Sequence, residues 1–113
     1  MSEMTLAERA LQIWPILVMA ARNRQTFTYE AVGELIGVPP VAVGNCLGVL
    51  MRYGKANNLP PIAVLVVSKE TGKPLGGLSA VEQLDRDRER VFNHDWLRRA
   101  PLTLERLEPY TRE

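Results

Sequence analysis

Residues 28–55 read TYEAVGELIGVPPVAVGNCLGVLMRYGK, a stretch that predicts two helices joined by a tight turn. Thr28 is a favoured N-cap residue, so the first helix is expected to begin directly after it. Gly37 tolerates the left-handed backbone conformation that closes a helix. Pro40 suits the first turn of a following helix, because its missing N–H would be unbonded there anyway. The stretch therefore indicates a helix-turn-helix.

The second of these helices is expected to have an inner and an outer face. Val43, Leu47 and Leu50 recur at helical spacing, which predicts a stripe that packs inward. Cys46 lies beside this stripe and is expected to be a small buried hydrophobic residue. The opposite stripe is predicted to face outward and contains Val41, Asn45, Gly48, Arg52 and Lys55.

A hairpin is expected after the second helix. The run Ile62–Val67 is rich in β-branched residues and has the length of a buried strand. Residues 70–72 have the composition of a turn, and residues 73–77 can return as a short second strand. The pattern predicts a β-hairpin wing beside the helix-turn-helix.

Capping-box patterns predict further helices at both ends of the chain. Thr5 with Glu8 forms the first pattern, and the apolar residues that follow predict a largely buried N-terminal helix. Ser79 with Glu82 repeats the pattern before the C-terminal helices. The charged run Asp85–Arg90 alternates acid and base, which is typical of a solvated and internally paired helix face.

Length and composition allow one sizeable core. The chain has 113 residues, of which 46% are hydrophobic, and a chain of this size folds around a single core. The expected fold class is α+β and mostly helical, a winged helix-turn-helix with a β-hairpin wing and added N- and C-terminal helices. The single domain 1–113 is expected to comprise an N-terminal helix (5–22), the helix-turn-helix and wing (28–77) and C-terminal helices (79–113).

Charge and cysteine content limit the classes of partner and site. The net charge is +1, with 14 Lys and Arg residues against 13 Asp and Glu residues, so no strong overall field draws the protein to nucleic acid. One Cys and one His cannot form a structural zinc site. A lone cysteine fits a reducing compartment, and the apolar stretch Ile13–Ala21 is too short to cross a bilayer. We expect a cytoplasmic protein with no metal, cofactor, small-molecule substrate or membrane partner.

Short fragments of the sequence occur in an informative order. They are Thr28-Tyr29, Ile36-Gly37, Ala42-Val43-Gly44-Asn45, Leu59-Pro60 and Thr71-Gly72-Lys73-Pro74-Leu75-Gly76-Gly77. Their order and approximate spacing resemble the C-terminal winged-helix domain of the DNA alkylguanine alkyltransferases and of their catalytically inactive alkyltransferase-like relatives. The resemblance covers residues 28–77, somewhat under half of the chain.

The resemblance implies a DNA-binding fold without alkyl-transfer chemistry. The family's Pro-Cys-His-Arg segment, whose cysteine takes the alkyl group, falls on Ala63–Val66, which supply no nucleophile. The family's arginine finger, which fills the gap left by a flipped base, falls on Val41. Tyr29 matches a family tyrosine that contacts the backbone beside the flipped nucleotide, and Asn57 or Asn58 approximates an active-site asparagine. We therefore expect no enzymatic activity.

DNA binding is the function that this scaffold favours. A winged helix places its second helix in the major groove and its wing along the backbone. Asn45 is expected to reach a base edge, and hydroxyl groups at the N-terminus of the first helix are expected to contact phosphate. The protein would be a non-catalytic binder of double-stranded DNA, either a regulator or a repair-associated factor. The candidate DNA-binding residues are Thr28, Tyr29, Asn45, Arg52, Lys55, Lys69 and Lys73.

A protein-interaction or self-associating module is the alternative interpretation. The expected outer face of the second helix is apolar and poor in arginine, unlike that of most groove-reading helices. It contains Val41, Gly44, Gly48 and Val49. Such a surface favours a protein partner. The N-terminal helix is also apolar enough to suggest a homodimer interface around Trp14 and Leu17.

Overall fold

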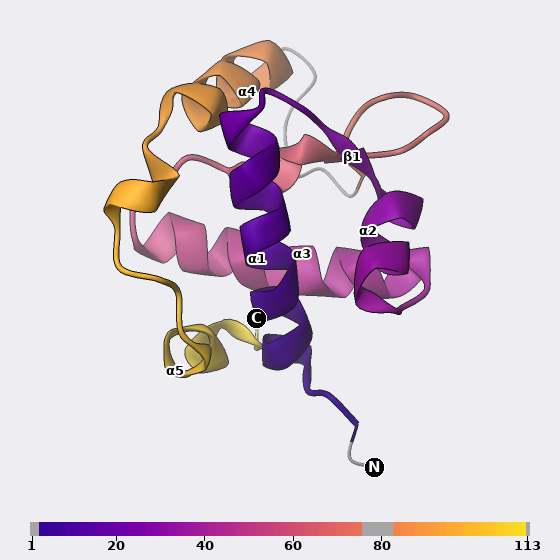
Figure 1. The fold of residues 1–113 in the computed structure, drawn as a ribbon, viewed down its shortest axis with the longest axis vertical. Coiled ribbons are helices and arrows are strands. Elements are labelled where there is room, and N and C mark those ends of the chain that lie inside the picture. Colours follow the sequence, from indigo (N-terminus) through magenta and orange to yellow (C-terminus); the bar gives the residue numbers. More distant parts are fainter. Residues whose placement is uncertain (1–2, 76–82, 113) are drawn as a thin grey trace.

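Helix α1 (Leu6–Arg22) runs through the middle of the computed structural model, which describes residues 3–75 and 83–112 (Figure 1). The predicted capping box is confirmed. The Thr5 hydroxyl accepts a hydrogen bond from the Glu8 N–H at 3.1 Å, and the Glu8 carboxylate accepts one from the Thr5 N–H at 2.8 Å. Leu17 is fully buried, so its predicted place in a dimer interface is wrong. The other elements of the same chain pack on α1 and bury many of its apolar side chains, although Met19 is 56% exposed.

Both ends of the first central helix and the start of the second are as predicted. Helix α2 (Tyr29–Ile36) is capped by Thr28, whose hydroxyl accepts a hydrogen bond from a first-turn N–H at 3.0 Å. Gly37 closes α2 in the left-handed conformation, with φ of 78°. Helix α3 (Pro40–Ala56) begins with a proline in its first turn, and the chain bends by 91° between α2 and α3.

The run Ile62–Val67 forms a strand only at its end, so the longer predicted strand is wrong. Ile62–Leu65 form a 3₁₀ helix (η1), and Val66–Val67 form strand β2, which pairs in parallel with β1 (Phe27–Thr28). The Ile62 N–H donates a hydrogen bond to the Pro60 carbonyl at 2.9 Å, and the Val64 N–H donates one to the Pro61 carbonyl at 3.1 Å. These local bonds turn the chain into the 3₁₀ helix. Short apolar runs suit a buried helical turn as well as a strand, because both bury every side chain.

Residues 68–75, called the 68–75 loop below, form a closed turn without the predicted return strand. The Ser68 N–H donates a hydrogen bond to the Lys73 carbonyl at 2.8 Å. Pro74 has no N–H, and the Leu75 N–H donates to a tyrosine hydroxyl, so no ladder continues through the described part of the predicted strand. The last two residues of that predicted strand lie outside the described residues.

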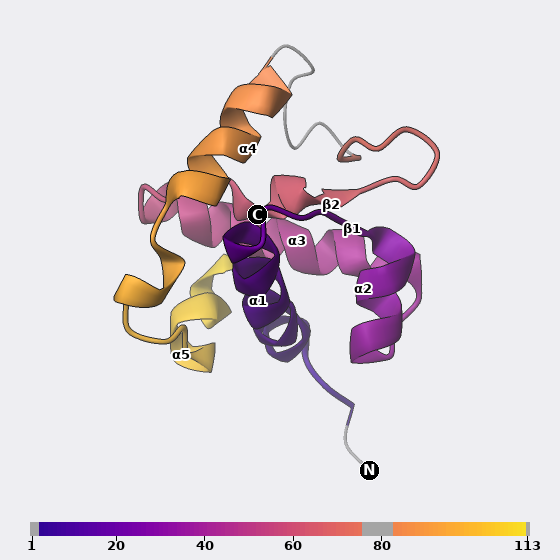
Figure 2. The same cartoon turned by 45° about the horizontal axis from the view of Figure 1, so that its top comes forward.

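The chain continues on the side of α1 away from α2. Its elements are α4 (Leu84–Asn93), η3 (Trp96–Arg98), α5 (Leu104–Leu107) and η4 (Glu108–Tyr110). Figures 1 and 2 both place α5 across α1 from α2. The capping box expected at residues 79–82 lies outside the described residues. Thr103 caps α5, and its hydroxyl accepts a hydrogen bond from the Arg106 N–H at 3.4 Å.

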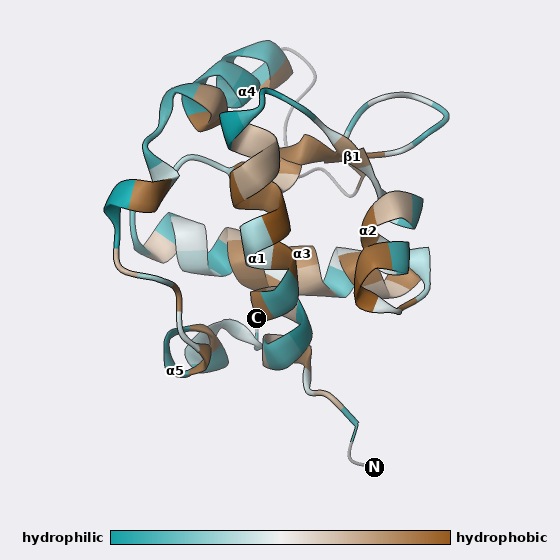
Figure 3. Cartoon of the chain, in the orientation of Figure 1, coloured by the Kyte–Doolittle hydropathy of each residue, from teal (hydrophilic) through white to brown (hydrophobic). Residues whose placement is uncertain are grey.

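The core lies where α1, α3 and η1 meet. Figure 3 shows hydrophobic residues gathered at this junction, whereas α4 is hydrophilic over most of its length. The Trp14 ring makes edge contacts with Tyr53 and Trp96, at centroid distances of 5.8 and 5.6 Å. Val49, predicted to face outward, is fully buried, because α3 is covered by several elements rather than along one stripe. No single described helix is long and apolar enough to cross a membrane; α2 and α3 pass that test only as a bent pair.

Candidate nucleic-acid interface

The N-terminal half of α3 is exposed beside the 68–75 loop. Val41 is 82% exposed, and Gly44 and Asn45 are exposed with it. A Cβ atom on Gly44 would meet nothing within 4 Å, so the helix backbone is open to approach there. A cavity of about 460 Å³ lies between this part of α3, the start of α2 and the 68–75 loop. Its lining comprises Tyr29, Glu30, Pro40, Val41, Gly44, Ser68, Glu70 and Leu75.

The 68–75 loop is anchored on both sides and carries two exposed cations. The Tyr29 hydroxyl accepts a hydrogen bond from the Leu75 N–H at 3.0 Å. From α4, the Arg88 guanidinium donates to the Gly72 carbonyl at 2.8 Å. Lys69 and Lys73 are exposed on the loop. The anchors hold the loop, and with it the two lysines, in a fixed position, and other residues of the loop share a cavity with the exposed start of α3.

Two carboxylates lie in the same region and reduce its positive charge. The Ser68 hydroxyl donates a hydrogen bond to Glu70 at 2.8 Å, and this bond holds the pKa of the Glu70 carboxyl below its usual value. One carboxylate oxygen of Glu30 is buried without a hydrogen-bond partner in the described structure. The two carboxylates would repel a phosphate group placed directly over the cavity. The lysines of the loop offer a more favourable position for the phosphates of a nucleic acid.

Several residues predicted to contact DNA also make hydrogen bonds within the protein. The Thr28 hydroxyl caps α2, and the buried Tyr29 accepts a hydrogen bond from the loop. The Arg52 Nε–H donates to the Tyr110 carbonyl at 2.8 Å, which ties α3 to η4. In these bonds the Thr28 and Tyr29 hydroxyls are acceptors and Arg52 uses only its Nε–H, so the donors that the DNA interpretation assigned to phosphate are not all occupied.

The remaining predicted residues fall into separate places. Asn45 lines a shallow pocket with Gly48 and Arg52, beside Thr111. Lys55 lines a different cavity at the other end of α3. Along a helix that rises ~1.5 Å per residue, Lys55 lies about 15 Å from the turn that holds Asn45. The structure therefore brings Asn45 and Arg52 together but leaves Lys55 apart.

The arginines of α4 are the residues that the sequence interpretation missed. The run Asp85–Arg90 was expected to pair internally, but Arg88 reaches the 68–75 loop and Arg90 lines the cavity that contains Lys55. Within the run, the ion pair of Arg90 with Asp87 spans 3.8 Å. No local pattern signals these contacts, because they depend on where α4 lies in the tertiary structure.

The positions that the resemblance aligns with reactive residues are inert. Ala63–Val66 are fully buried and have aliphatic side chains. Cys46 is buried as predicted, and burial raises the pKa of its thiol, which disfavours the nucleophilic thiolate. In the described part of the chain no three His, Cys, Asp or Glu residues are grouped to hold a metal ion.

Comparisons of the chain with protein-family models, with curated proteins and with solved structures found no match.

Proposed function

We propose that this protein is a non-catalytic DNA-binding protein of the winged-helix type, either a regulator or a repair-associated factor. In this proposal, the exposed half of α3 enters a groove of double-stranded DNA and the 68–75 loop lies along the backbone as the wing. A bend of 91° between α2 and α3, across a turn closed by Gly37, falls in the range of helix-turn-helix motifs. The order of fragments shared with the alkyltransferase-like proteins supports the same arrangement.

One observation carries the proposal: the anchored, lysine-bearing 68–75 loop lies beside the exposed start of α3. One hydrogen bond that the loop donates to Tyr29 and one that it accepts from Arg88 hold it on two sides. Asn45 offers both a hydrogen-bond donor and an acceptor to a base edge, and Lys69 and Lys73 offer charge to phosphates. This division between one reading helix and one backbone-contacting loop is what winged-helix recognition requires.

The proposal predicts that the loop lysines carry much of the salt dependence. Binding to a labelled random duplex is measured by fluorescence anisotropy at several salt concentrations. Each phosphate contact contributes ~0.9 to the slope of log affinity against log salt, so Lys69→Gln with Lys73→Gln should reduce the slope by about 2. Arg98→Gln with Arg106→Gln makes the same charge change.

The control residues belong to η3 and α5, and Figure 1 places α5 across the molecule from the loop, so this pair should leave the slope unchanged. Equal effects of the two double variants would mean that only net charge matters, which contradicts an interface at the loop. Absence of binding at low salt would overturn the DNA proposal itself.

A second candidate function, docking of a protein, is favoured by the apolar surface beside the cavity. Val41 and Leu75 both line this cavity and are 82% and 54% exposed. With the carboxylates of Glu30 and Glu70, they suit a basic and partly apolar partner segment better than they suit phosphate. Self-association through this surface would be abolished by Val41→Asp in sedimentation experiments. A monomeric wild-type protein would exclude the self-associating form.

A further inference from the structure

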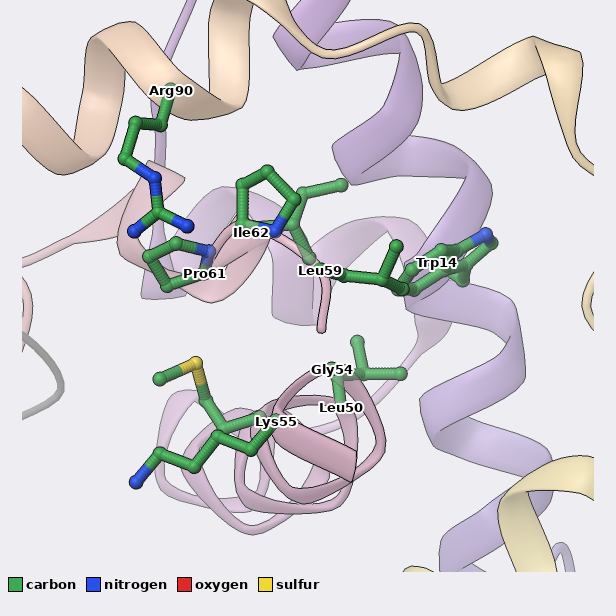
Figure 4. Close-up of a pocket in the computed structure, with 10 residues that line it drawn as sticks. Trp14, Leu50, Gly54, Lys55, Leu59, Pro61, Ile62 and Arg90 are labelled. Atoms are coloured by element: carbon green, nitrogen blue, oxygen red, sulfur yellow. The ribbon is translucent and has the colours of Figure 1, made fainter. Parts of the chain in front are cut away.

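A second cavity, of about 230 Å³, opens between α1, α3 and the segment before η1 (Figure 4). Its walls are mainly apolar. They are formed by Trp14 of α1, by Leu50 and Met51 of α3, and by Leu59, Pro60, Pro61 and Ile62. The cavity is smaller than the ~300–1,000 Å³ of sites for drug-sized ligands, so its occupant would be small.

Two cations from different elements border this apolar space. Lys55 extends from the last turn of α3 and Arg90 from α4, and Figure 4 shows their nitrogen atoms on the same side of the cavity. No acidic residue lines it among the described residues. The Lys55 ammonium group makes no hydrogen bond or ion pair within the described structure. The ion pair of Arg90 with Asp87 is long, at 3.8 Å, and the Arg90 side chain is 55% exposed.

Two like charges at the rim of an apolar cavity create a positive potential that the low-dielectric walls focus. A carboxylate between them would form charge-assisted hydrogen bonds, and the planar guanidinium of Arg90 can bind it through two N–H groups. The body attached to that carboxylate would displace water from the walls formed by Trp14 and Ile62. Free phosphate would interact with Lys55 and Arg90 but would bury no apolar surface against the walls of the cavity.

We propose that this cavity binds a small organic anion, a carboxylate carried on a compact aromatic or aliphatic body. The site is separate from the exposed start of α3 and the 68–75 loop, so it does not depend on the proposed DNA binding. Lys55 and Arg90 neutralise the carboxylate, and the Trp14 side of the cavity accommodates the apolar body.

Benzoate is the probe that tests this assignment. It is titrated into the ¹⁵N-labelled full-length protein, and chemical shifts of the Trp14 indole N–H and the Arg90 Nε–H are followed. We expect saturable shifts of both signals. Benzyl alcohol has the body without the charge and inorganic phosphate has the charge without the body, so both should bind at least about tenfold more weakly, as expected for loss of a charge-assisted contact or of the apolar burial.

Variants locate the site. Lys55→Gln and Arg90→Gln should each weaken benzoate binding about tenfold, because each removes one charged partner. Arg99→Gln is the matched control, because Arg99 lines another apolar groove that also contains Trp14. Spectra of all three variants report whether the fold is retained. Benzoate binding that is lost in Arg99→Gln but retained in the other two, binding no stronger than that of phosphate, or no binding at all would overturn the proposal.

Discussion

Tyr29 joins two segments that are far apart in the chain. Its phenolic oxygen accepts a hydrogen bond from the Leu75 N–H at 3.0 Å, and the residue is only 6% exposed. This bond fixes the end of the 68–75 loop against the start of α2. We therefore expect Tyr29 to influence DNA binding through the position of the loop and not by touching phosphate.

Tyr29→Phe removes the acceptor and keeps the ring. A net hydrogen-bond contribution of ~0.5–1.5 kcal/mol predicts that the free energy of unfolding falls by about 1 kcal/mol, which urea denaturation measures. The Leu75 amide should exchange faster with solvent, because its N–H loses its partner.

Tyr53→Phe is the matched control for this substitution. Tyr53 is also buried, at 4% exposure, and its hydroxyl makes no hydrogen bond within the described structure. This variant should leave the Leu75 exchange rate unchanged. The same rate in wild type and in Tyr29→Phe would show that the bond does not hold the loop.

Gly33 in α2 and Gly44 in α3 differ in how much space surrounds their Cα atoms. A Cβ atom on Gly33 would lie 2.5 Å from the carbonyl oxygen of Val38, in the turn between the helices. A Cβ atom on Gly44 would meet nothing within 4 Å. The missing side chain at Gly33 therefore lets the turn pack closely on α2, whereas Gly44 has no such packing constraint.

Alanine at these two positions should have effects of opposite sign. Gly33→Ala forces the backbone of the turn to move and should lower the free energy of unfolding by ~1–3 kcal/mol. Gly44→Ala, in an exposed helix interior, should raise it by up to ~1 kcal/mol. Chemical denaturation compares both variants with the wild type. A Gly33→Ala protein as stable as the wild type would contradict the close contact.

Local signals predicted the helices but not the strands. Thr28, Gly37 and Pro40 act on their immediate neighbours, so both ends of α2 and the start of α3 could be inferred from residue type. The run Ile62–Val67 lacks any periodicity that distinguishes a strand from a helical turn. Its short parallel pairing with Phe27–Thr28 depends on how α1, α2 and α3 pack, which no local pattern encodes.

In the candidate interface, the sequence predicted which side chains of a single helix or loop are exposed, but not which side chains contact other elements. Asn45 and the loop lysines are exposed as the helical and turn patterns indicated. The roles of Arg52 and Arg88 were not predictable, because their partners are the Tyr110 and Gly72 carbonyls on other elements. Residue charge alone therefore does not predict whether a basic side chain is free to contact a ligand or is bound within the protein.

Over the whole molecule, charge is nearly balanced, and this sets the expected strength of DNA binding. The net charge is +1, and the acids Glu30 and Glu70 lie beside the exposed part of α3. Few phosphates would be neutralised, so affinity should be modest and should fall less steeply with salt than for strongly basic domains. If the protein binds DNA as proposed, base contacts from α3 would have to provide the specificity, because phosphate contacts carry no sequence information.

The most direct test of the proposed interface is a ¹H–¹⁵N NMR titration of the protein with a short random duplex at low salt. The largest amide shifts are expected at the 68–75 loop and at Gly44, which lines a cavity with that loop, and at Asn45, which lines the adjoining pocket with Gly44. Amides of α5, on the other side of the molecule, should not shift (Figure 2). Shifts confined to α5 or its neighbours, or no shifts at all, would contradict DNA binding through α3 and the loop.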